Sequence, residues 1–191
     1  MIHKGTKTIE TERIILRPFK TTDAQAMFSN WASDDEVTRY LTWPTHSSVE
    51  VTNLLLADWT NHYSENNYYQ WAIVLKDNGD EPIGGISVVE TNEFLGNVEI
   101  GYCIGRKWWN KGIVTEAFSA LIRFFFEEVG AEKVFARHDV NNPASGRVMQ
   151  KCGLKFEGVI RRELLAKEKP RDLAHYSILK GEYYSQNSIN R

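Results

Sequence analysis

The chain has 191 residues, of which 42% are hydrophobic and 25% are charged, and its formal net charge is −2. This composition is ordinary for a globular protein, and a domain of this length buries about 70% of its unfolded surface. The charge lacks the basic excess of nucleic-acid-binding domains, and two cysteines make neither a disulfide framework nor a metal cluster. We therefore expect one domain over residues 1–191, a reducing cytoplasm, no metal and no direct nucleic-acid partner.

The N-terminal part of the chain predicts a strand and a helix. Residues 1–7 lack the apolar run of a signal peptide, and no later run approaches the roughly 18 apolar residues of a membrane span. Residues 9–18 alternate like a strand that Pro18 ends, and Asp23 suits the start of a helix that reaches about residue 33. We therefore expect a soluble protein without a membrane partner.

An acidic run, residues 34–36, comes next and is followed by Tyr40 and Trp43. Acidic residues at a helix start commonly match the helix dipole, which is one interpretation. The other interpretation is an acidic and aromatic wall for a cationic amine. Ser48 and Glu50 then resemble a capping box that opens a helix ending near residue 63.

Residues 68–76 and 82–90 are rich in aromatic and β-branched residues, and the turn signal 77–80 lies between them. They predict a hairpin. The Gly84-Gly85 pair inside its second strand suggests a bulge or a close approach of two backbones.

Residues 98–104 predict the central strand. The two-residue period places Glu99, Gly101 and Cys103 on one face, which is nearly free of bulky side chains. A carboxylate beside a position without a side chain offers room for a small acyl group and a proton acceptor. The alternative is a strand-edge glutamate in a surface ion pair.

A long helix follows. Apolar residues at helical spacing form one stripe from Val114 to Val129, and Gly130 suits its C-terminal end. The helix therefore starts near Ile113, where free backbone N–H groups, the helix dipole and Gly112 together suit an oxyanion. Arg106, Lys107 and Lys111 add positive charge nearby. The alternative is an ordinary strand-to-helix turn. Neither G-x-x-x-x-G-K-[ST] nor G-x-G-x-x-G is present, which disfavours kinases and dinucleotide enzymes.

The C-terminal third predicts a strand at 133–140, a short helix, and two strands at 154–165 and 172–179. Asn142 suits the N-cap of the short helix, Pro143 its first position and Gly153 its end. Ser145 lies in its first turn, so Asn142 and Ser145 either cap the helix or place a hydroxyl at its positive end. His138 and His175 fall inside strands, where packing is the ordinary role, and residues 185–191 suit a frayed tail.

The order and spacing of several segments resemble the GNAT acetyltransferase superfamily, and most of all its Rim-type branch, which acetylates the N-termini of ribosomal proteins. The segments are Thr11 to Pro18, Glu99-Ile100-Gly101-Tyr102, Asn110 to Ala117, Asn142 to Ser145, Lys151 to Leu154, and Arg171-Asp172. Together with the order of elements, the resemblance predicts an α+β layered fold in which helices flank a mixed central sheet.

The resemblance also implies roles for individual residues. The loop Asn110-Lys111-Gly112-Ile113-Val114-Thr115 would bind the pyrophosphate of acetyl-CoA, although Val114 replaces the usual Gly or Ala. The backbone of Cys103 and Ile104 would pair with the pantetheine arm, which Asn142 would also contact. Glu99 would accept the amine proton directly or through water, and Ser145 would protonate the leaving thiolate.

The resulting expectation is an acetyl-CoA-dependent N-acetyltransferase that acts without a covalent enzyme intermediate. The acceptor would be a ribosomal protein N-terminus, another peptide amine, or a small amine such as an antibiotic or polyamine. The alternative is a non-catalytic acyl-CoA-binding sensor, which would need neither Glu99 nor Ser145. Trp108 and Trp109, expected to be exposed, would pack at a homodimer surface or cover the cofactor loop.

Overall fold

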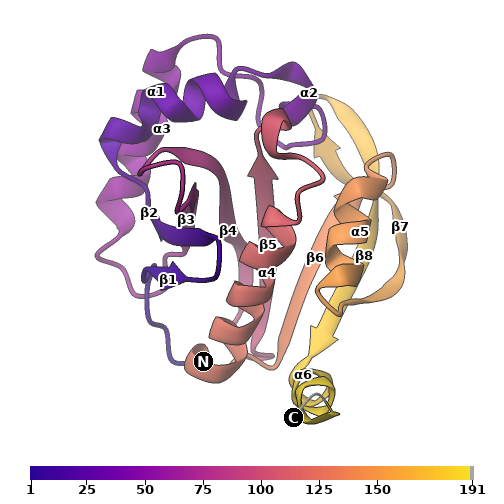
Figure 1. Ribbon diagram of the computed structural model, residues 1–191. Helices are drawn as coiled ribbons and strands as arrows, with labels where there is room; N and C mark the ends of the chain where they lie inside the picture. Colours follow the sequence, from indigo (N-terminus) through magenta and orange to yellow (C-terminus); the bar gives the residue numbers. More distant parts are fainter. Residues whose placement is uncertain (190–191) are drawn as a thin grey trace.

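The computed structural model describes residues 1–189, which fold into an eight-stranded sheet flanked by helices (Figure 1). The strands are β1 Ile9–Glu10, β2 Ile14–Pro18, β3 Gln70–Leu75, β4 Pro82–Asn92, β5 Asn97–Ile104, β6 Lys133–Asp139, β7 Lys155–Ala166 and β8 Lys169–Leu179. The helices are α1 Ala24–Met27, α2 Asp35–Thr38, α3 Val49–His62, α4 Ile113–Phe124, α5 Pro143–Lys151 and α6 Lys180–Ile189. Short 3-10 turns, η1 Thr21–Asp23 and η3 Arg106–Trp108, and π-helical turns, η2 Phe28–Ala32 and η4 Phe125–Val129, complete the set.

The strand order is β1-β2-β3-β4-β5-β6-β8-β7. The β5–β6 pair is parallel, whereas the other neighbouring pairs are antiparallel. A parallel neighbour requires a long crossover, and α4 supplies it between β5 and β6. The prediction of an α+β fold with a mixed sheet is confirmed.

Two apolar layers cover the two faces of the sheet. The larger buried cluster packs α4 and the Met149 side of α5 against residues of the central strands such as Val98, Ile100 and Val134. The smaller cluster joins α1, α3 and the η2 turn to Ala72 and Val74. Figure 1 shows α4 and α5 in front of the sheet, with α1 and α3 near its N-terminal strands.

Helix α4 follows its sequence pattern closely. It begins at Ile113, directly after Gly112 with φ +75°, and its apolar stripe is buried. The helix continues through the η4 turn to Gly130, whose φ of +78° ends it. Both glycines therefore occupy left-handed backbone conformations, in which a β-branched residue would be strained.

Two predicted segments differ from the structure. Residues 9–18 are a tight hairpin, because β1 turns back on β2 and places Ile9 opposite Leu16. The α6 helix covers residues 180–189 and thus includes part of the segment expected to be frayed, while residues 190–191 lie outside the described part. A short polar segment gave no helical stripe from which α6 could be read.

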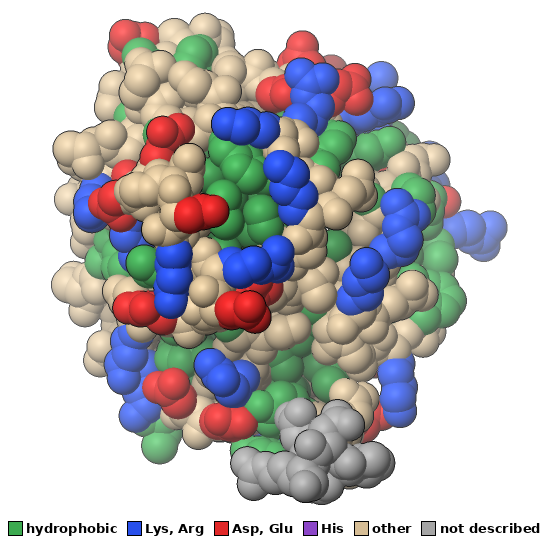
Figure 2. All heavy atoms as spheres, in the orientation of Figure 1, with side chains coloured by type: hydrophobic (Ala, Val, Ile, Leu, Met, Phe, Trp, Pro, Cys, Tyr) green, Lys and Arg blue, Asp and Glu red, His purple; other side chains and the backbone are tan. Residues whose placement is uncertain are grey.

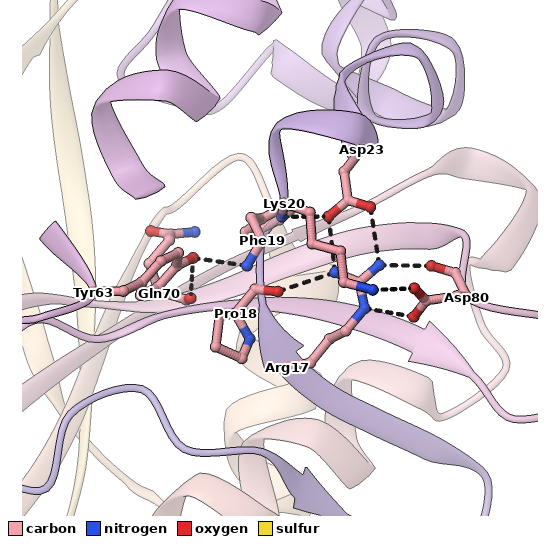
Figure 3. A network of polar contacts seen from close by, with 8 residues as sticks. All are labelled: Arg17, Pro18, Phe19, Lys20, Asp23, Tyr63, Gln70 and Asp80. Atoms are coloured by element: carbon pink, nitrogen blue, oxygen red, sulfur yellow. Dashed lines mark hydrogen bonds and ion pairs between the residues drawn. The ribbon is translucent and has the colours of Figure 1, made fainter. Parts of the chain in front are cut away.

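A buried ion pair fixes the start of the helical layer to the sheet (Figure 3). Arg17, at the end of β2, donates from Nη1 and Nη2 to the two carboxylate oxygens of Asp23 at 2.8 and 2.9 Å. Its Nε donates to Asp80 at 2.6 Å, and the Lys20 N–H also donates to Asp23. Burial lowers the pKa of Arg17, but hydrogen bonds and charges from Asp23 and Asp80 raise it on balance, so the guanidinium stays charged.

The β3–β4–β5 meander contains the expected glycine pair at a close approach of two backbones. A Cβ on Gly84 would lie 2.5 Å from the Cys103 carbonyl oxygen. On the β3 side the register shifts between Ile73 and Val74, which leaves Ile83, next to Gly84, as an extra residue of β4. On the β5 side the register shifts between Val88 and Glu90, so the bulge next to β5 lies at Val89. Among residues 1–189, no helix combines the length and the apolar run that crossing a membrane requires.

Candidate active site

The candidate site lies where β5 and β6 separate. The two strands pair in parallel over three positions, from Asn97 opposite Lys133 to Glu99 opposite Phe135. Beyond Glu99, β5 continues to Ile104 and pairs with β4 on its other side. Within the described residues, the edge of β5 that faces β6 after Glu99 has no strand partner. Apart from the Ile104 carbonyl, which accepts from Trp109 Nε1, the backbone groups on this edge are therefore free for an extended ligand.

Glu99 stands at the point of separation and is 5% exposed. Arg137 of β6 makes a bidentate contact with the Glu99 carboxylate: Nε donates to Oε1 at 2.8 Å and Nη2 to Oε2 at 2.6 Å. The third nitrogen, Nη1, donates to Glu163 at 2.9 Å. The other Glu163 oxygen accepts from His175 Nε2 at 2.6 Å. These four residues form one polar network, which we call the Glu99 network.

Hydrogen bonds within the Glu99 network shift the pKa values of Arg137 and Glu163 toward their charged forms. Hydrogen bonds to Glu99, followed by those to Glu163, raise the pKa of Arg137. Burial alone would raise the pKa of Glu163, but hydrogen bonds from His175 and Arg137 bring it below its usual range. Glu163 therefore stays ionised near neutral pH and is a weak base, and it lies beside Glu99 on the same guanidinium.

Sequence reasoning predicted Glu99 but missed its three partners. His175 was expected to pack, and it instead contributes a hydrogen bond to Glu163. Arg137 lies opposite His175 in the β6–β8 ladder, and Glu163 lies where the β7 register shifts between Ile160 and Leu164. Strand alternation could have placed Arg137 on a polar face, but no local pattern shows a register shift that turns Glu163 inward.

The space expected at Gly101 is filled. A Cβ on Gly101 would lie 2.7 Å from Cγ2 of Val89, the residue at the β4 bulge. Gly101 therefore makes room for a neighbouring strand rather than for an acyl group. The sequence could not reveal this because the bulge that turns Val89 toward β5 depends on strand pairing.

Ser145 and Asn142 lie together at the start of α5. The Asn142 side chain donates from Nδ2 to Ser145 Oγ at 3.1 Å and makes no cap hydrogen bond to the helix backbone. Because Oγ accepts this hydrogen bond, its own proton remains free to be donated. Tyr102 of β5 donates to the Ser145 carbonyl at 3.1 Å, which ties β5 to the start of α5.

The loop before α4 has the backbone expected of an oxyanion site. Asn110 has φ +59° and Gly112 has φ +75°, so two left-handed positions bend the chain just before the helix. Within the described residues, the backbone N–H groups of residues 110–115 have no hydrogen-bond acceptor. The backbone N–H groups along this turn, including those of Lys111, Ile113 and Thr115, are therefore free to donate to a bound anion.

Positive charge surrounds this loop. Figure 2 shows Lys and Arg side chains gathered around an apolar area near the N-terminal end of α4. Arg106 is tied to Asp34 at 2.7 Å, and the Lys107 ammonium lies 5.1 Å from the Trp108 ring centre. Lys111 is exposed and has no anionic partner in the described part of the chain. The loop therefore fits a group that carries several negative charges.

Three residues of this region differ from expectation or resolve a question that the sequence left open. Trp108 is buried, contrary to prediction, and a Cβ on Gly105 would collide with its ring. Trp109 is 41% exposed and donates from Nε1 to the Ile104 carbonyl at 2.9 Å. Val114 belongs to the buried core, so its bulk is directed away from the loop surface.

The acidic run of residues 34–36 starts a helix. Asp34 accepts a hydrogen bond from the Glu36 N–H as N-cap of α2, and its second oxygen accepts from Arg106. Asp35 accepts from Thr45. With these carboxylates already engaged inside the protein, the helix-start interpretation explains the run better than an amine-binding wall.

His138 and the two cysteines have structural environments. His138 Nδ1 faces the Asp139 carbonyl at 2.8 Å, and the ring stacks on Tyr176 on the α5 side of the sheet. Burial raises the pKa of Cys103 to about 12 and that of Cys152 to about 11. Neither thiol forms an appreciable thiolate at neutral pH.

Comparison with known proteins gives one consistent result. The family described as acetyltransferase (GNAT) domain matches residues 13–155. The chain is 33% identical to the "Uncharacterized N-acetyltransferase YoaA" of Bacillus subtilis, over 90% of this chain and 96% of that protein. It is also 33% identical to the [ribosomal protein uS5]-alanine N-acetyltransferase of Escherichia coli, over 38% of each chain. The crystal structure of the GNAT-family acetyltransferase from Bacillus anthracis superimposes with a TM-score of 0.80 at 24% identity, covering 92% of this chain and all of that one.

Proposed function

The chain belongs to the GNAT family of N-acetyltransferases, and from this premise we propose that it moves the acetyl group of acetyl-CoA directly to the N-terminal amine of a protein. Acetyl-CoA is the co-substrate that the family uses. The YoaA relative carries no acceptor in its name, whereas the shorter match to the uS5-alanine enzyme has a ribosomal protein as acceptor. The acceptor proposed here is accordingly of the ribosomal-protein type.

In this proposal the cofactor lies along β5 and ends at the α4 loop. The free N–H groups of residues 110–115 would bind the pyrophosphate, with Lys111 adding charge. The edge of β5 at Cys103 and Ile104, which has no strand partner on the β6 side, would pair with the pantetheine amides as an added strand does, and Trp109 would have to release the Ile104 carbonyl for a ligand amide to use it. Asn142, at the start of α5, would contact the same arm.

The transfer needs one proton acceptor and one proton donor. The amine nitrogen attacks the thioester carbonyl, so that a C–N bond forms and the C–S bond breaks. The proton that the nitrogen loses passes to Glu99, directly or through water, and the thiolate receives a proton from Ser145, whose hydroxyl is reprotonated by solvent. Because Asn142 already donates to Ser145 Oγ, the Ser145 proton is free for this step.

The hydrogen bonding of both carboxylates in the Glu99 network is the observation that favours an N-terminal amine. Both oxygens of Glu99 accept from Arg137, and both oxygens of Glu163 accept from Arg137 and His175. Such a site does not readily deprotonate a strongly basic ammonium. At pH 7 roughly 10% of a terminal amine with a pKa near 7.7–8.0 is already free base, against well under about 0.1% of a lysine near 10.4. Once the amine has attacked, its nitrogen is acidic, and a weak carboxylate base suffices.

The test is release of CoA thiol with a matched set of acceptors. The set comprises ribosomal-protein N-terminal peptides, the same peptides acetylated at the N-terminus, a lysine peptide, a polyamine and an aminoglycoside. We expect turnover with free N-termini and its loss on N-acetylation. We also expect the rate to level off near pH 8, where the terminal amine becomes free base. Turnover with only the lysine peptide or the small amines would refute the proposed acceptor.

The alternative, a non-catalytic acyl-CoA sensor, would share the loop and the β5 edge. A sensor does not require the free hydroxyl of Ser145 beside Asn142 or the buried Glu99 side chain at the strand separation. Calorimetry on the same sample distinguishes the two functions, because tight acetyl-CoA binding without turnover on the whole acceptor set would support the sensor.

Direct transfer predicts that the cysteines are dispensable. With pKa values of about 12 for Cys103 and about 11 for Cys152, the thiolate fraction at pH 8 is on the order of 10⁻³ or less. We expect the double substitution Cys103→Ala and Cys152→Ala to leave kcat within about threefold, with no burst of CoA in the progress curve. A folded double variant that binds acetyl-CoA but has lost turnover would contradict direct transfer.

A further inference from the structure

The first strands of the chain reach the cofactor loop through Arg13, a residue that follows β1 and precedes β2. Its Nε donates to Glu116 Oε2 at 2.6 Å, and its backbone N–H donates to Glu116 Oε1 at 2.9 Å. Nη1 donates to the Lys111 carbonyl at 3.0 Å. Thr11, in the same turn, also donates to Glu116. Arg13 thus contacts the loop backbone and the first turn of α4 at once.

The remaining nitrogen of Arg13 lies beside the loop glycine. Nη2 is 3.5 Å from the position that a Cβ on Gly112 would occupy. None of residues 1–189 accepts a hydrogen bond from it, whereas Nε and Nη1 are both engaged. The guanidinium is therefore held in one orientation with an unused donor next to the free N–H groups of residues 110–115.

Glu116 anchors this arrangement. Burial alone would raise the pKa of Glu116, but hydrogen bonds from Thr11 and from Arg13 lower it on balance. The carboxylate thus remains charged and keeps Arg13 in place at neutral pH. An arginine fixed by a carboxylate loses less conformational freedom when it binds an oxyanion than a free surface lysine does.

From these contacts we propose that Arg13 is a phosphate-binding residue of the cofactor site, fixed by Glu116 and directed past Gly112. The inference rests on the cofactor half of the proposed function and is independent of the acceptor. Arg13 holds the Lys111 carbonyl so that the turn keeps its amides exposed, and Nη2 donates to a phosphate oxygen of acetyl-CoA. Charge-assisted hydrogen bonds of this kind are stronger than neutral ones.

The experiment compares two thioesters that differ in their phosphates. Acetyl-CoA and S-acetylpantetheine share the acyl arm, but the second has no phosphate. For Arg13→Ala we expect the Kd of acetyl-CoA, measured by calorimetry, and its KM to rise at least tenfold, with kcat at saturation within about twofold. The KM of S-acetylpantetheine should not change. Arg13→Lys should recover part of the acetyl-CoA affinity because it restores the charge without the planar geometry.

The matched control is Lys76→Ala. Lys76 follows β3 and forms an exposed ion pair at 3.2 Å with Glu10 of the N-terminal hairpin, so this variant removes another ion pair of that hairpin. This variant should bind acetyl-CoA like the parent protein. An unchanged Kd for Arg13→Ala would overturn the inference, and so would an equal loss for both thioesters, since the role would then be structural. If the parent protein fails on every amine acceptor but binds acetyl-CoA, the proposed acceptor fails while the Arg13 inference remains open to this test.

Discussion

Glu99→Gln should lower kcat by about 10² to 10⁴ and leave the affinity for acetyl-CoA nearly unchanged. The substitution preserves the size of the side chain but removes the proton acceptor at the separation of β5 and β6. It also leaves the Arg137 charge, now held by Glu163 alone, facing the positively charged nitrogen that forms on attack. The measurement is steady-state turnover with the best acceptor, together with calorimetric binding of acetyl-CoA.

The matched control for Glu99 is Glu163→Gln. It removes a carboxylate from the same network, yet leaves the bidentate contact between Arg137 and Glu99 intact. We expect a fall of less than about tenfold, because the proton acceptor stays in place. A large loss in Glu163→Gln with normal turnover in Glu99→Gln would transfer the role of proton acceptor to Glu163.

Asp23→Ala should be the most destabilising single change in the Arg17 network shown in Figure 3, with an expected loss of about 3–5 kcal/mol in the free energy of unfolding. The Asp23 side chain is 6% exposed and accepts from both terminal nitrogens of Arg17, which is itself 8% exposed. Its removal leaves a buried guanidinium with only part of its hydrogen bonding. Urea denaturation should show a lower midpoint with an unchanged slope.

Asp80→Ala provides the comparison for Asp23. Asp80 also accepts from Arg17, at 2.6 Å, but its side chain is 61% exposed. Water replaces such a partner easily, so we expect a loss of about 1 kcal/mol or less. Equal losses for the two variants would show that burial does not govern the strength of this network.

The local elements could be predicted from the sequence because their signals are local. The apolar stripe of α4, the left-handed glycines at its two ends and the Asn142-Pro143 start of α5 each depend on a few adjacent residues. The loop 110–115, the proposed cofactor loop, could be located for the same reason. Its free N–H groups follow from a helix N-terminus after a turn.

The polar network around Glu99 could not be predicted because it depends on strand pairing. Arg137 reaches Glu99 through the parallel contact of β5 with β6, and His175 lies opposite Arg137 in a ladder between segments far apart in the chain. Glu163 joins them at a register shift in β7. None of these relations is encoded in the spacing of neighbouring residues.

Long-range packing likewise decided the predictions that were wrong. Val89 fills the space at Gly101 because β4 bulges, and Trp108 is buried because Gly105 leaves room for its ring. Arg13 lies in the opening segment that resembles the family, but its contact with Glu116 spans 103 positions of the chain.

By itself the sequence determined the family and the helices and strands with strong periodicity, and it pointed to Glu99, Asn142, Ser145 and the loop 110–115 as candidate site residues. The tertiary structure alone decided which polar groups meet. Glu99 is bound by Arg137, Ser145 receives a hydrogen bond from Asn142, and Arg13 joins the cofactor loop. The physical reason is that dihedral preferences and apolar periodicity act over a few residues, whereas ion pairs form wherever the sheet register brings side chains together.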